Sequence, residues 1–181
     1  SNRYEPNDFY YESGDQWYLD NNGQNNGTHG IDLNIQNTWN GFTGNGVVIG
    51  VIDDGVDYNN PDLSPNFLNA DSYDYCDDDN DVMPSDSDGD GKVDWHGTAV
   101  SGIAAGKGDN EIGIAGVAYN SSIIGIRLVG GDCERTDNLE ADSLSHRLDL
   151  VDIYVNSWGP ADDGNILGRM STLTLAAIEA G

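Results

Sequence analysis

Apolar and polar residues are arranged along the chain in blocks that predict strands alternating with helices. Three short apolar runs, rich in β-branched residues, have the length and composition of buried strands. They cover residues 46–53, 121–129 and 152–159. Small or apolar residues recur at helical spacing in three further segments, which cover residues 96–105, 138–150 and 170–181. This alternation indicates an α/β fold in which helices flank a parallel sheet.

The beginning of the chain has a different composition from the rest. It is polar and rich in Gly and Asn, with Trp17, Tyr18 and Trp39 as candidate aromatic anchors. We therefore expect an N-terminal arm over residues 1–45, wrapped on a domain that covers residues 46–181. Within that domain, an acidic segment broken by Gly and Pro predicts a loop over residues 70–94.

The charge balance limits the classes of partner. The chain has 32 acidic and 7 basic residues, with a formal net charge of −25. Nucleic acid is excluded as an expected partner, because neutralising phosphates requires Lys and Arg. The charge instead favours cations, either metal ions or basic peptides. Apolar runs, four Trp and nine Tyr residues favour a packed fold over disorder, so we expect cations to neutralise many of the acids.

Two further features concern the environment of the protein. No apolar run reaches the length of a membrane span, so we expect no membrane partner. The high content of Asp, Asn and Gly with few Lys favours a secreted protein. Cys76 and Cys133 lie in loops that flank the expected cleft, and both a disulfide and two free thiols are compatible with the sequence.

A candidate catalytic pair lies at the end of the first predicted strand. Asp53 ends that strand, and sites of parallel α/β sheets form at the carboxyl ends of strands. His96 begins a helix of small residues, so its ring can project into a cleft. A carboxylate that accepts a hydrogen bond from imidazole fixes its tautomer and stabilises the imidazolium. An Asp and a His alone are weak evidence, and the flanking segments decide their meaning.

These flanking segments carry a family resemblance over about residues 8–181. They are VIDDGVDYNNPDL, HGTAVSGIAAG, GIAGVAYNSSIIGIRL and NSWGPADDG. In their order and spacing the chain resembles the subtilase family of serine proteases, and within it the kexin/furin-like proprotein convertases. The resemblance implies a subtilisin-like fold, incomplete in this chain, and a calcium-dependent secreted endopeptidase. Such an enzyme cleaves peptides or proteins after basic, or dibasic, residues through an acyl-enzyme.

The resemblance also implies roles for individual residues. Asp53 matches the acid of the catalytic triad and His96 its general base. The nucleophilic Ser and the oxyanion Asn are expected beyond this chain, in the remaining part of the catalytic domain. Ser157 matches a strand that pairs with substrate, so it is not the expected nucleophile. His29 and His146 are expected to have no catalytic role.

Several acids match residues that recognise basic substrate side chains. A carboxylate that faces Arg makes a charge-assisted, often bidentate pair. Some relatives place one more acid three residues before the catalytic His. Val93 occupies that position here, and Asp94 is a candidate substitute. The implied substrate-binding residues are Asp54, Asp137, Glu140, Ser157, Trp158, Gly159 and Asp162.

Three regions predict calcium sites, and calcium prefers six to eight oxygen ligands. The resemblance implies the first region, in which three residues act through backbone carbonyls and three through side chains. The carbonyls belong to Lys107, Ile112 and Ile114, and the side chains to Asp8, Asp62 and Asn110. It also implies a second region at Asp74, Asp79 and Asp81, with Asp77 as an additional candidate.

The third region is predicted from its pattern alone. D-x-D-x-D-G resembles the start of an EF-hand loop but lacks the final Glu, so a plain acidic turn is an equal alternative. Its candidate ligands are Asp86, Asp88, Asp90 and Asp94. Two alternatives to the whole interpretation also remain open. One is a subtilase of broader specificity, and the other is a non-catalytic calcium-binding module or pseudoprotease.

Overall fold

The computed structural model describes residues 4–86, 92–131, 133–160, 164–165 and 168–181. The predictions for Asp88, Asp90 and Asp162 therefore lie outside the described residues. The chain divides into two compact units, and each is described by itself. The first unit comprises Ser1–Val47, Tyr58–Phe67 and Ser101–Ile123, and the second comprises Val48–Asp57, Leu68–Val100 and Ile124–Gly181.

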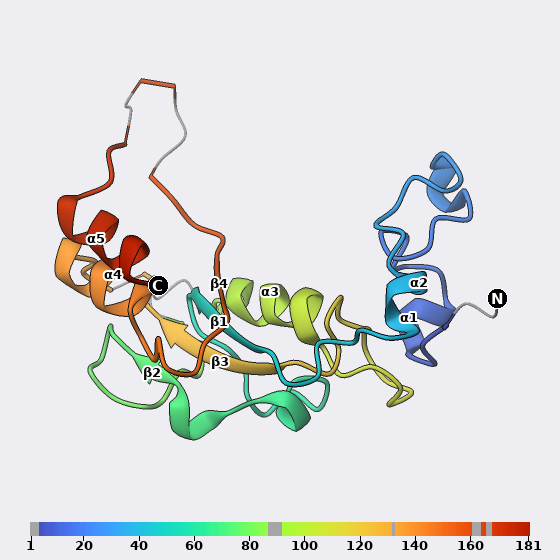
Figure 1. Cartoon of the computed structure of the whole chain (residues 1–181), viewed down its shortest axis with the longest axis horizontal. Helices are drawn as coiled ribbons and strands as arrows, with labels where there is room; N and C mark the ends of the chain where they lie inside the picture. The colour runs from blue at the N-terminus through green and yellow to red at the C-terminus, as the bar shows by residue number, and fades with distance from the viewer. Residues whose placement is uncertain (1–3, 87–91, 132, 161–163, 166–167) are drawn as a thin grey trace. The chain divides into compact units, whose positions relative to one another are not determined.

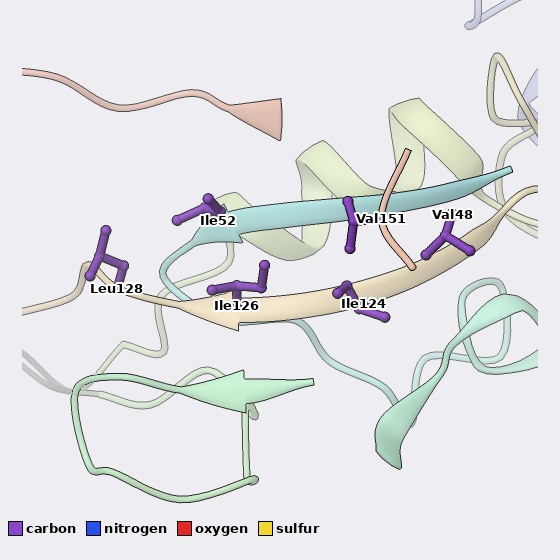
Figure 2. Packing of buried hydrophobic residues seen from close by; sticks show 6 residues of the cluster. All are labelled: Val48, Ile52, Ile124, Ile126, Leu128 and Val151. Carbon is purple, nitrogen blue, oxygen red and sulfur yellow. The ribbon is translucent and has the colours of Figure 1, made fainter. Parts of the chain in front are cut away.

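A four-stranded sheet dominates the second unit, with the strand order β2-β3-β1-β4 (Figure 1). The strands are β1 (Val48–Asp53), β2 (Tyr73–Asp74), β3 (Ser122–Arg127) and β4 (Ile153–Asn156). β1 is parallel to β4, and β2 is parallel to β3. Figure 2 shows β1 and β3 running in the same direction. The prediction of a parallel α/β sheet is confirmed, and the carboxyl ends of β1 and β4 meet at one edge.

Branched apolar side chains of β1, of β3 and of residues next to β3 and β4 form the core of the second unit. Figure 2 shows the cluster Val48, Ile52, Ile124, Ile126, Leu128 and Val151. β1 is buried over its full length, as expected for a strand covered on both faces. Each fully buried Ile stabilises the fold by about 1.5–3 kcal/mol relative to an exposed one. The end of β1 is therefore a rigid support for its last residue.

In the part of the chain that the structure describes, three helices of eight or more residues lie where the pattern predicted them. They are α3 (His96–Ala105), α4 (Asp137–Leu144) and α5 (Thr172–Ala180). The bounds predicted for α3 are confirmed. α4 and α5 contact each other and lie side by side in Figure 1. Thr136 and Ser171 cap the N-termini of α4 and α5 by accepting hydrogen bonds from backbone N–H groups three residues on.

The prediction of a helix to residue 150 is wrong, because α4 ends at Leu144. Arg147 has a φ of +55°, a left-handed conformation that interrupts a helix. Its guanidinium pairs with Asp71 and Asp149, and these contacts hold the chain in the turn that follows α4. The loop predicted over residues 70–94 also needs correction. Tyr73–Asp74 forms β2, which is too short for a periodic pattern to reveal.

The first unit is built from short helical turns around aromatic residues. Its elements are α1 (Phe9–Glu12), η1 (Gln24–Asn26), α2 (Gln36–Trp39) and η2 (Ser64–Asn66). A further short turn, η3 (Asn69–Asp71), belongs to the second unit. Leu19, Trp39, Ala115 and Tyr119 form the core of the first unit.

The three candidate anchors of the arm differ in the structure, and Tyr18 packs, partly buried, against the core of the first unit. Trp39 is buried, and its indole N–H donates to the carbonyl of Val117 at 2.8 Å. Trp17 is 49 % exposed, so the prediction that it anchors the arm is wrong. Within the described residues, no helix has the length and apolar character needed to cross a membrane.

Candidate active site

Asp53 and His96 meet at the carboxyl end of β1. Asp53 is the last residue of β1 and only 2 % exposed, whereas His96 is the first residue of α3. The Nδ1 atom of His96 lies 2.8 Å from Oδ1 of Asp53. An ionised carboxylate can only accept hydrogen bonds, so Nδ1 is the donor. The other ring nitrogen, Nε2, is then the one that can take a proton from a substrate or nucleophile.

The local electrostatics favour the charged form of this imidazole. The hydrogen bond that His96 donates to Asp53 raises the pKa of His96, and the charges of Asp53 and Asp54 act in the same direction. Partial burial opposes the shift by disfavouring the cation. The His96 side chain is 56 % exposed, so its ring is accessible from the pocket. This arrangement suits a general base whose protonated form must be stabilised.

Asp54 holds the N-terminus of α3. Its Oδ2 accepts a hydrogen bond from the backbone N–H of His96 at 3.0 Å, and its Oδ1 accepts one from Gly97 at 2.7 Å. Burial raises the pKa of Asp54, the N–H of Gly97 lowers it, and the charge of Asp53 raises it again. Asp54 therefore satisfies two N–H groups that a helix start leaves without partners.

Gly97 allows the helix to approach the strand closely. A Cβ atom at this position would lie 2.2 Å from the carbonyl oxygen of Gly55 and 2.8 Å from Cβ of Asp53. Both distances are far below van der Waals contact, and one of the atoms belongs to the backbone. The sequence HGT therefore places a glycine where no side chain fits, and this closeness brings His96 within reach of Asp53.

An open pocket lies beside the Asp53–His96 pair, and we call it the catalytic pocket. Its lining residues are Asp53, Asp54, Asp94, His96, Val129, Gly130, Gly131, Ser157 and Trp158. The indole N–H of Trp158 donates to the carbonyl of Ile52 at 2.9 Å, which fixes this wall to β1. The structure thus brings together residues predicted from four separate segments.

The same carboxylates could also suggest a metal site. Ligand atoms of Asp53, Asp54 and His96 all lie within 4.8 Å of one another. N–H donors already occupy Oδ1 of Asp53 and both oxygens of Asp54. Oδ2 of Asp53 is buried, and it has no hydrogen-bond partner within the described part of the chain. Hydrogen bonds thus account for three of the four carboxylate oxygens of Asp53 and Asp54.

A second pocket shares Trp158 with the catalytic pocket, and we call it the upstream pocket. Its lining includes Asp137 and Glu140 of α4, Asn156 of β4, and Gly159. The sequence assigned Asp137, Glu140 and Gly159 to substrate binding, and Trp158 lines both pockets. The upstream pocket also contains Arg135, which the sequence analysis missed. The sequence could have indicated this position, because Arg135 immediately precedes Thr136, which caps the helix that carries Glu140.

Comparison with known proteins assigns this arrangement to a family. The model of the Subtilase family matches residues 44–180, which include Asp53, His96 and both pockets. The chain belongs to the subtilase family. A PC3-like endoprotease (variant B) of Hydra vulgaris is 45 % identical over 177 residues, covering 97 % of this chain and 24 % of that protein. Human neuroendocrine convertase 2 is 44 % identical over 170 residues, covering 92 % of this chain and 26 % of that protein.

Solved structures support the same fold. A protease of Pseudoalteromonas arctica superposes with a TM-score of 0.76 at 27 % identity, covering 97 % of this chain and 55 % of that chain. A serine protease of Aeromonas sobria gives a TM-score of 0.69 at 31 % identity, covering 81 % of this chain and 25 % of that chain. The subtilase chain thus spans about a quarter of the length of the curated relatives described above.

The first predicted calcium region of this subtilase chain lies in the first unit. Asp8 and Asp62 are both buried, and burial raises the pKa of each carboxyl. Asp62 accepts hydrogen bonds from the side chain of Asn110 at 2.8 Å and from the backbone N–H of Ile114 at 2.7 Å. Lys107 donates its backbone N–H to the carbonyl of Asp62 at 2.8 Å. Five of the six predicted ligands therefore lie around one loop.

The sixth, Ile112, belongs to the same loop and donates its N–H to Oδ1 of Asn110 at 3.0 Å. Gly113 curls this loop with a φ of +52°, and a Cβ there would lie 2.1 Å from Oδ2 of Asp62. Oδ2 of Asp8 accepts the N–H of Asp109, while its Oδ1 is buried and has no partner among the described residues. That buried, unpartnered oxygen is a free ligand for a cation.

The second predicted calcium region contains a cation of its own. The guanidinium of Arg127, which is 2 % exposed, lies 2.7 Å from Asp74 and 2.8 Å from Asp77. Oδ1 of Asp74 also accepts the N–H groups of Cys76 and Asp77. Asp79 and Asp81 instead accept backbone N–H groups two residues on in the loop. The sequence analysis missed Arg127, whose only signal was a lone cation in an apolar strand.

The remaining candidates are separated from these groups. In the third region, Asp86 is exposed and Asp94 lines the catalytic pocket. Cys76 and Cys133 form a disulfide, so the acidic loop is tied to the segment before α4. Nε2 of His146 donates a hydrogen bond to the carbonyl of Asp71, and its Nδ1 is hydrogen-bonded to the hydroxyl of Tyr75. It has no contact with the catalytic pair in the described structure.

Proposed function

We propose that this subtilase chain is the N-terminal part of the catalytic domain of a kexin-like serine endopeptidase. The enzyme is secreted, depends on calcium and cleaves proteins or peptides after basic residues. The observation that carries this proposal is the 2.8 Å hydrogen bond between Asp53 and His96 at the mouth of the catalytic pocket. The nucleophilic Ser and the oxyanion Asn belong to the remaining part of the domain, as the family resemblance implies.

The residues of this chain support a defined part of the mechanism. Nε2 of His96 takes the proton of the Ser hydroxyl as that oxygen attacks the scissile carbonyl, and later gives it to the leaving amine. Asp53 holds Nδ1 and stabilises the imidazolium that forms between these steps. Ser157, Trp158 and Gly159 offer an extended segment to which a substrate strand adds.

Acidic residues of the catalytic pocket support basic specificity. Asp54 and Asp94 line this pocket, and its described lining contains no Lys or Arg. A substrate Lys or Arg would therefore enter a site of negative charge, where a charge-assisted hydrogen bond is available. The charge of Asp94 also raises the pKa of Asp54, which places the two carboxylates in one electrostatic site. Asp94 is thus a reasonable substitute for the acid that Val93 replaces.

The calcium proposal rests on the chemistry of the first region. Its donors are oxygen atoms, and the unpartnered Oδ1 of buried Asp8 lies in the same electrostatic site as Asp62. Buried carboxylates without a counter-charge are costly, so a cation is the expected partner. Calcium would supply positive charge that holds the arm segment of Asp8 to the loop of Asn110. For the second and third regions, Asp79, Asp81 and Asp86 stay predictions.

Two observations support the proposed secretion and the proposed remaining part of the domain. A disulfide between Cys76 and Cys133 suits an oxidising compartment.

α5 exposes apolar side chains at Leu173, Leu175 and Ile178, each 48 % exposed. Apolar surfaces of this kind mark places where another part of a protein packs. The remaining part of the catalytic domain is the proposed cover.

The test is hydrolysis by the intact protein of matched peptides that end in Lys-Arg or in Ala-Phe before the reporter group. Activity on Lys-Arg that vanishes in Asp53→Ala and His96→Ala supports the proposal. Equal rates on both peptides would favour a broad-specificity subtilase, which the presence of Val93 makes the second candidate. No hydrolysis, with calcium still bound, would favour the non-catalytic module.

A further inference from the structure

A cation lies in the upstream pocket, where the sequence predicted acids. The Nε atom of Arg135 is 3.8 Å from Oε2 of Glu140, and the two side chains are 32 % and 21 % exposed. The guanidinium carbon also lies 4.7 Å from the ring centroid of Trp158, in the geometry of a cation–π contact. Arg135 thus contacts both the acid and the aromatic wall that a basic substrate side chain would use.

The backbone around Arg135 holds this side chain in place. The N–H of Arg135 donates to the carbonyl of Cys133 at 3.0 Å, and Cys133 is joined to Cys76 by a disulfide. The next residue, Thr136, caps α4 by accepting the N–H of Leu139. Arg135 therefore belongs to a short segment whose backbone is held at both ends, which fixes the position of its Cα atom beside the pocket.

The two pockets differ in charge because of this residue. Among the described residues of the upstream pocket, the formal charges of Arg135 and Arg169 cancel those of Asp137 and Glu140. The described lining of the catalytic pocket includes the acids Asp54 and Asp94 and no Lys or Arg. Counted over the described lining residues alone, the formal charge is thus negative beside the catalytic pair and zero in the upstream pocket.

We propose that Arg135 is a specificity-determining residue, which pairs with Glu140 and covers Trp158 and thereby suppresses recognition of a basic residue in the upstream pocket. This inference rests on the proposed function, because it assigns a role within that substrate cleft. A substrate Arg in this pocket must displace Arg135 from both contacts or share Glu140 with it. An uncharged side chain has neither cost. The enzyme therefore selects a basic residue near the cleaved bond and is indifferent to charge farther upstream.

The test uses the intact protein and peptides with basic residues at the cleavage site. Each upstream position carries either Arg or citrulline, which has nearly the same shape without the charge. For wild type, we expect a ratio of kcat/KM values for Arg over citrulline near one at the position served by the upstream pocket. Arg135→Ala should raise this ratio about tenfold, the effect of one charged hydrogen bond. It should leave the ratio at the position served by Asp54 unchanged.

Three further variants isolate the cause. Arg135→Lys keeps the positive charge, so its ratio should stay close to that of wild type. The double variant Arg135→Ala with Glu140→Gln should lose the gain. Arg169→Ala is the matched control, because Arg169 lines the same pocket while the ion pair of Glu140 is made with Arg135. Its ratio should change far less than that of Arg135→Ala.

The outcomes separate this inference from the function on which it rests. A wild-type ratio well above one at the Glu140-dependent position would overturn the inference, as would an unchanged ratio in Arg135→Ala. An equal gain in Arg169→Ala would overturn it too, because general pocket charge would then be the cause. Each of these results leaves the endopeptidase intact. Failure of wild type to cleave any of the peptides would overturn the proposed function, and the inference with it.

Discussion

The carboxylate of Asp54 accepts a hydrogen bond from the backbone N–H of His96 at 3.0 Å. The neighbouring Asp53 holds the imidazole of the same residue at 2.8 Å. Two adjacent acids at the end of one strand therefore fix both the backbone and the ring of His96. This arrangement explains why a buried apolar strand ends in a pair of carboxylates, and it gives Asp54 a structural role beside its proposed role in specificity.

Replacing Asp54 by Ala should destabilise the protein as well as change its specificity. The N–H groups of His96 and Gly97 would lose their acceptor at a partly buried helix start. We expect a decrease in the free energy of unfolding of about 1–3 kcal/mol, measured by urea denaturation. Asp54→Asn keeps one acceptor oxygen and should lose less stability while losing the charge. Equal stability of wild type and Asp54→Ala would contradict the capping role.

Gly97→Ala should move the N-terminus of α3 away from the end of β1. Its Cβ would lie 2.2 Å from the carbonyl oxygen of Gly55, so the N-terminus of α3 must shift. We expect loss of catalytic activity and a lower melting temperature, because a shift of about 1 Å is enough to reduce catalysis on the order of 100-fold. Gly41→Ala is the matched control, because a Cβ there meets no atom within 4 Å. Wild-type activity in Gly97→Ala would rule out this close packing.

The pair of Asp53 and His96 should be visible in the titration of the imidazole. The carboxylate raises the pKa of His96, mainly through its hydrogen bond. Asp53→Asn should therefore lower the pKa of His96, measured by NMR, because the negative charge is removed. In the intact enzyme His96 must be neutral to act as base, so the acidic limb of the kcat/KM profile should move to lower pH in this variant. The rate itself should fall on the order of 10⁴-fold.

The raised pKa of His96 also determines how the stability of the fold changes with pH. A folded-state pKa above the unfolded value stabilises the fold at pH values below the unfolded pKa. This contribution is lost as the pH rises through the folded pKa of His96. The side chain is more than half exposed, so solvent screening keeps the effect small. A pKa of His96 that is the same in wild type and Asp53→Asn would contradict the assigned hydrogen bond.

The local sequence pattern was sufficient to predict the helix and the strand that position the catalytic pair. The small residues of HGTAVSGIAA predict α3 with its observed bounds, and the apolar run before Asp53 predicts β1. The family motifs supplied the partnership of Asp53 with His96, which periodicity alone does not reveal. These features depend on residues close in sequence or on a pattern shared with other proteins.

Features that depend on distant side chains were missed. α4 ends early where Arg147 takes a left-handed conformation and pairs with Asp71, more than seventy residues away in sequence. The pairing of Asp74 with buried Arg127 likewise joins distant segments. Arg135 and Glu140 are near in sequence, but their pair spans the start of a helix and does not follow helical spacing. No periodic pattern could have predicted these contacts.

Removing calcium should lower the stability of the first unit. Asp8 and Asp62 are buried carboxylates that raise each other's energy in the absence of a cation. A ligand present at 100 times its dissociation constant stabilises a protein by about 2.7 kcal/mol. We therefore expect excess chelator to lower the melting temperature clearly, and added calcium to restore it. An unchanged melting temperature in chelator would contradict the calcium site.

Asp62→Asn removes the negative charge of this side chain, so it should show how much of the effect of calcium on stability depends on that charge. The variant should show a much smaller difference in melting temperature between calcium and chelator than wild type does. In chelator it should be at least as stable as wild type, because burial penalises the charge of Asp62, as the raised pKa of its carboxyl indicates. Asp15→Asn removes an exposed acid of the same unit and should behave as wild type in both conditions. Lower stability of Asp62→Asn in chelator would instead indicate that its hydrogen bonds to Asn110 and Ile114 outweigh the cost of its charge.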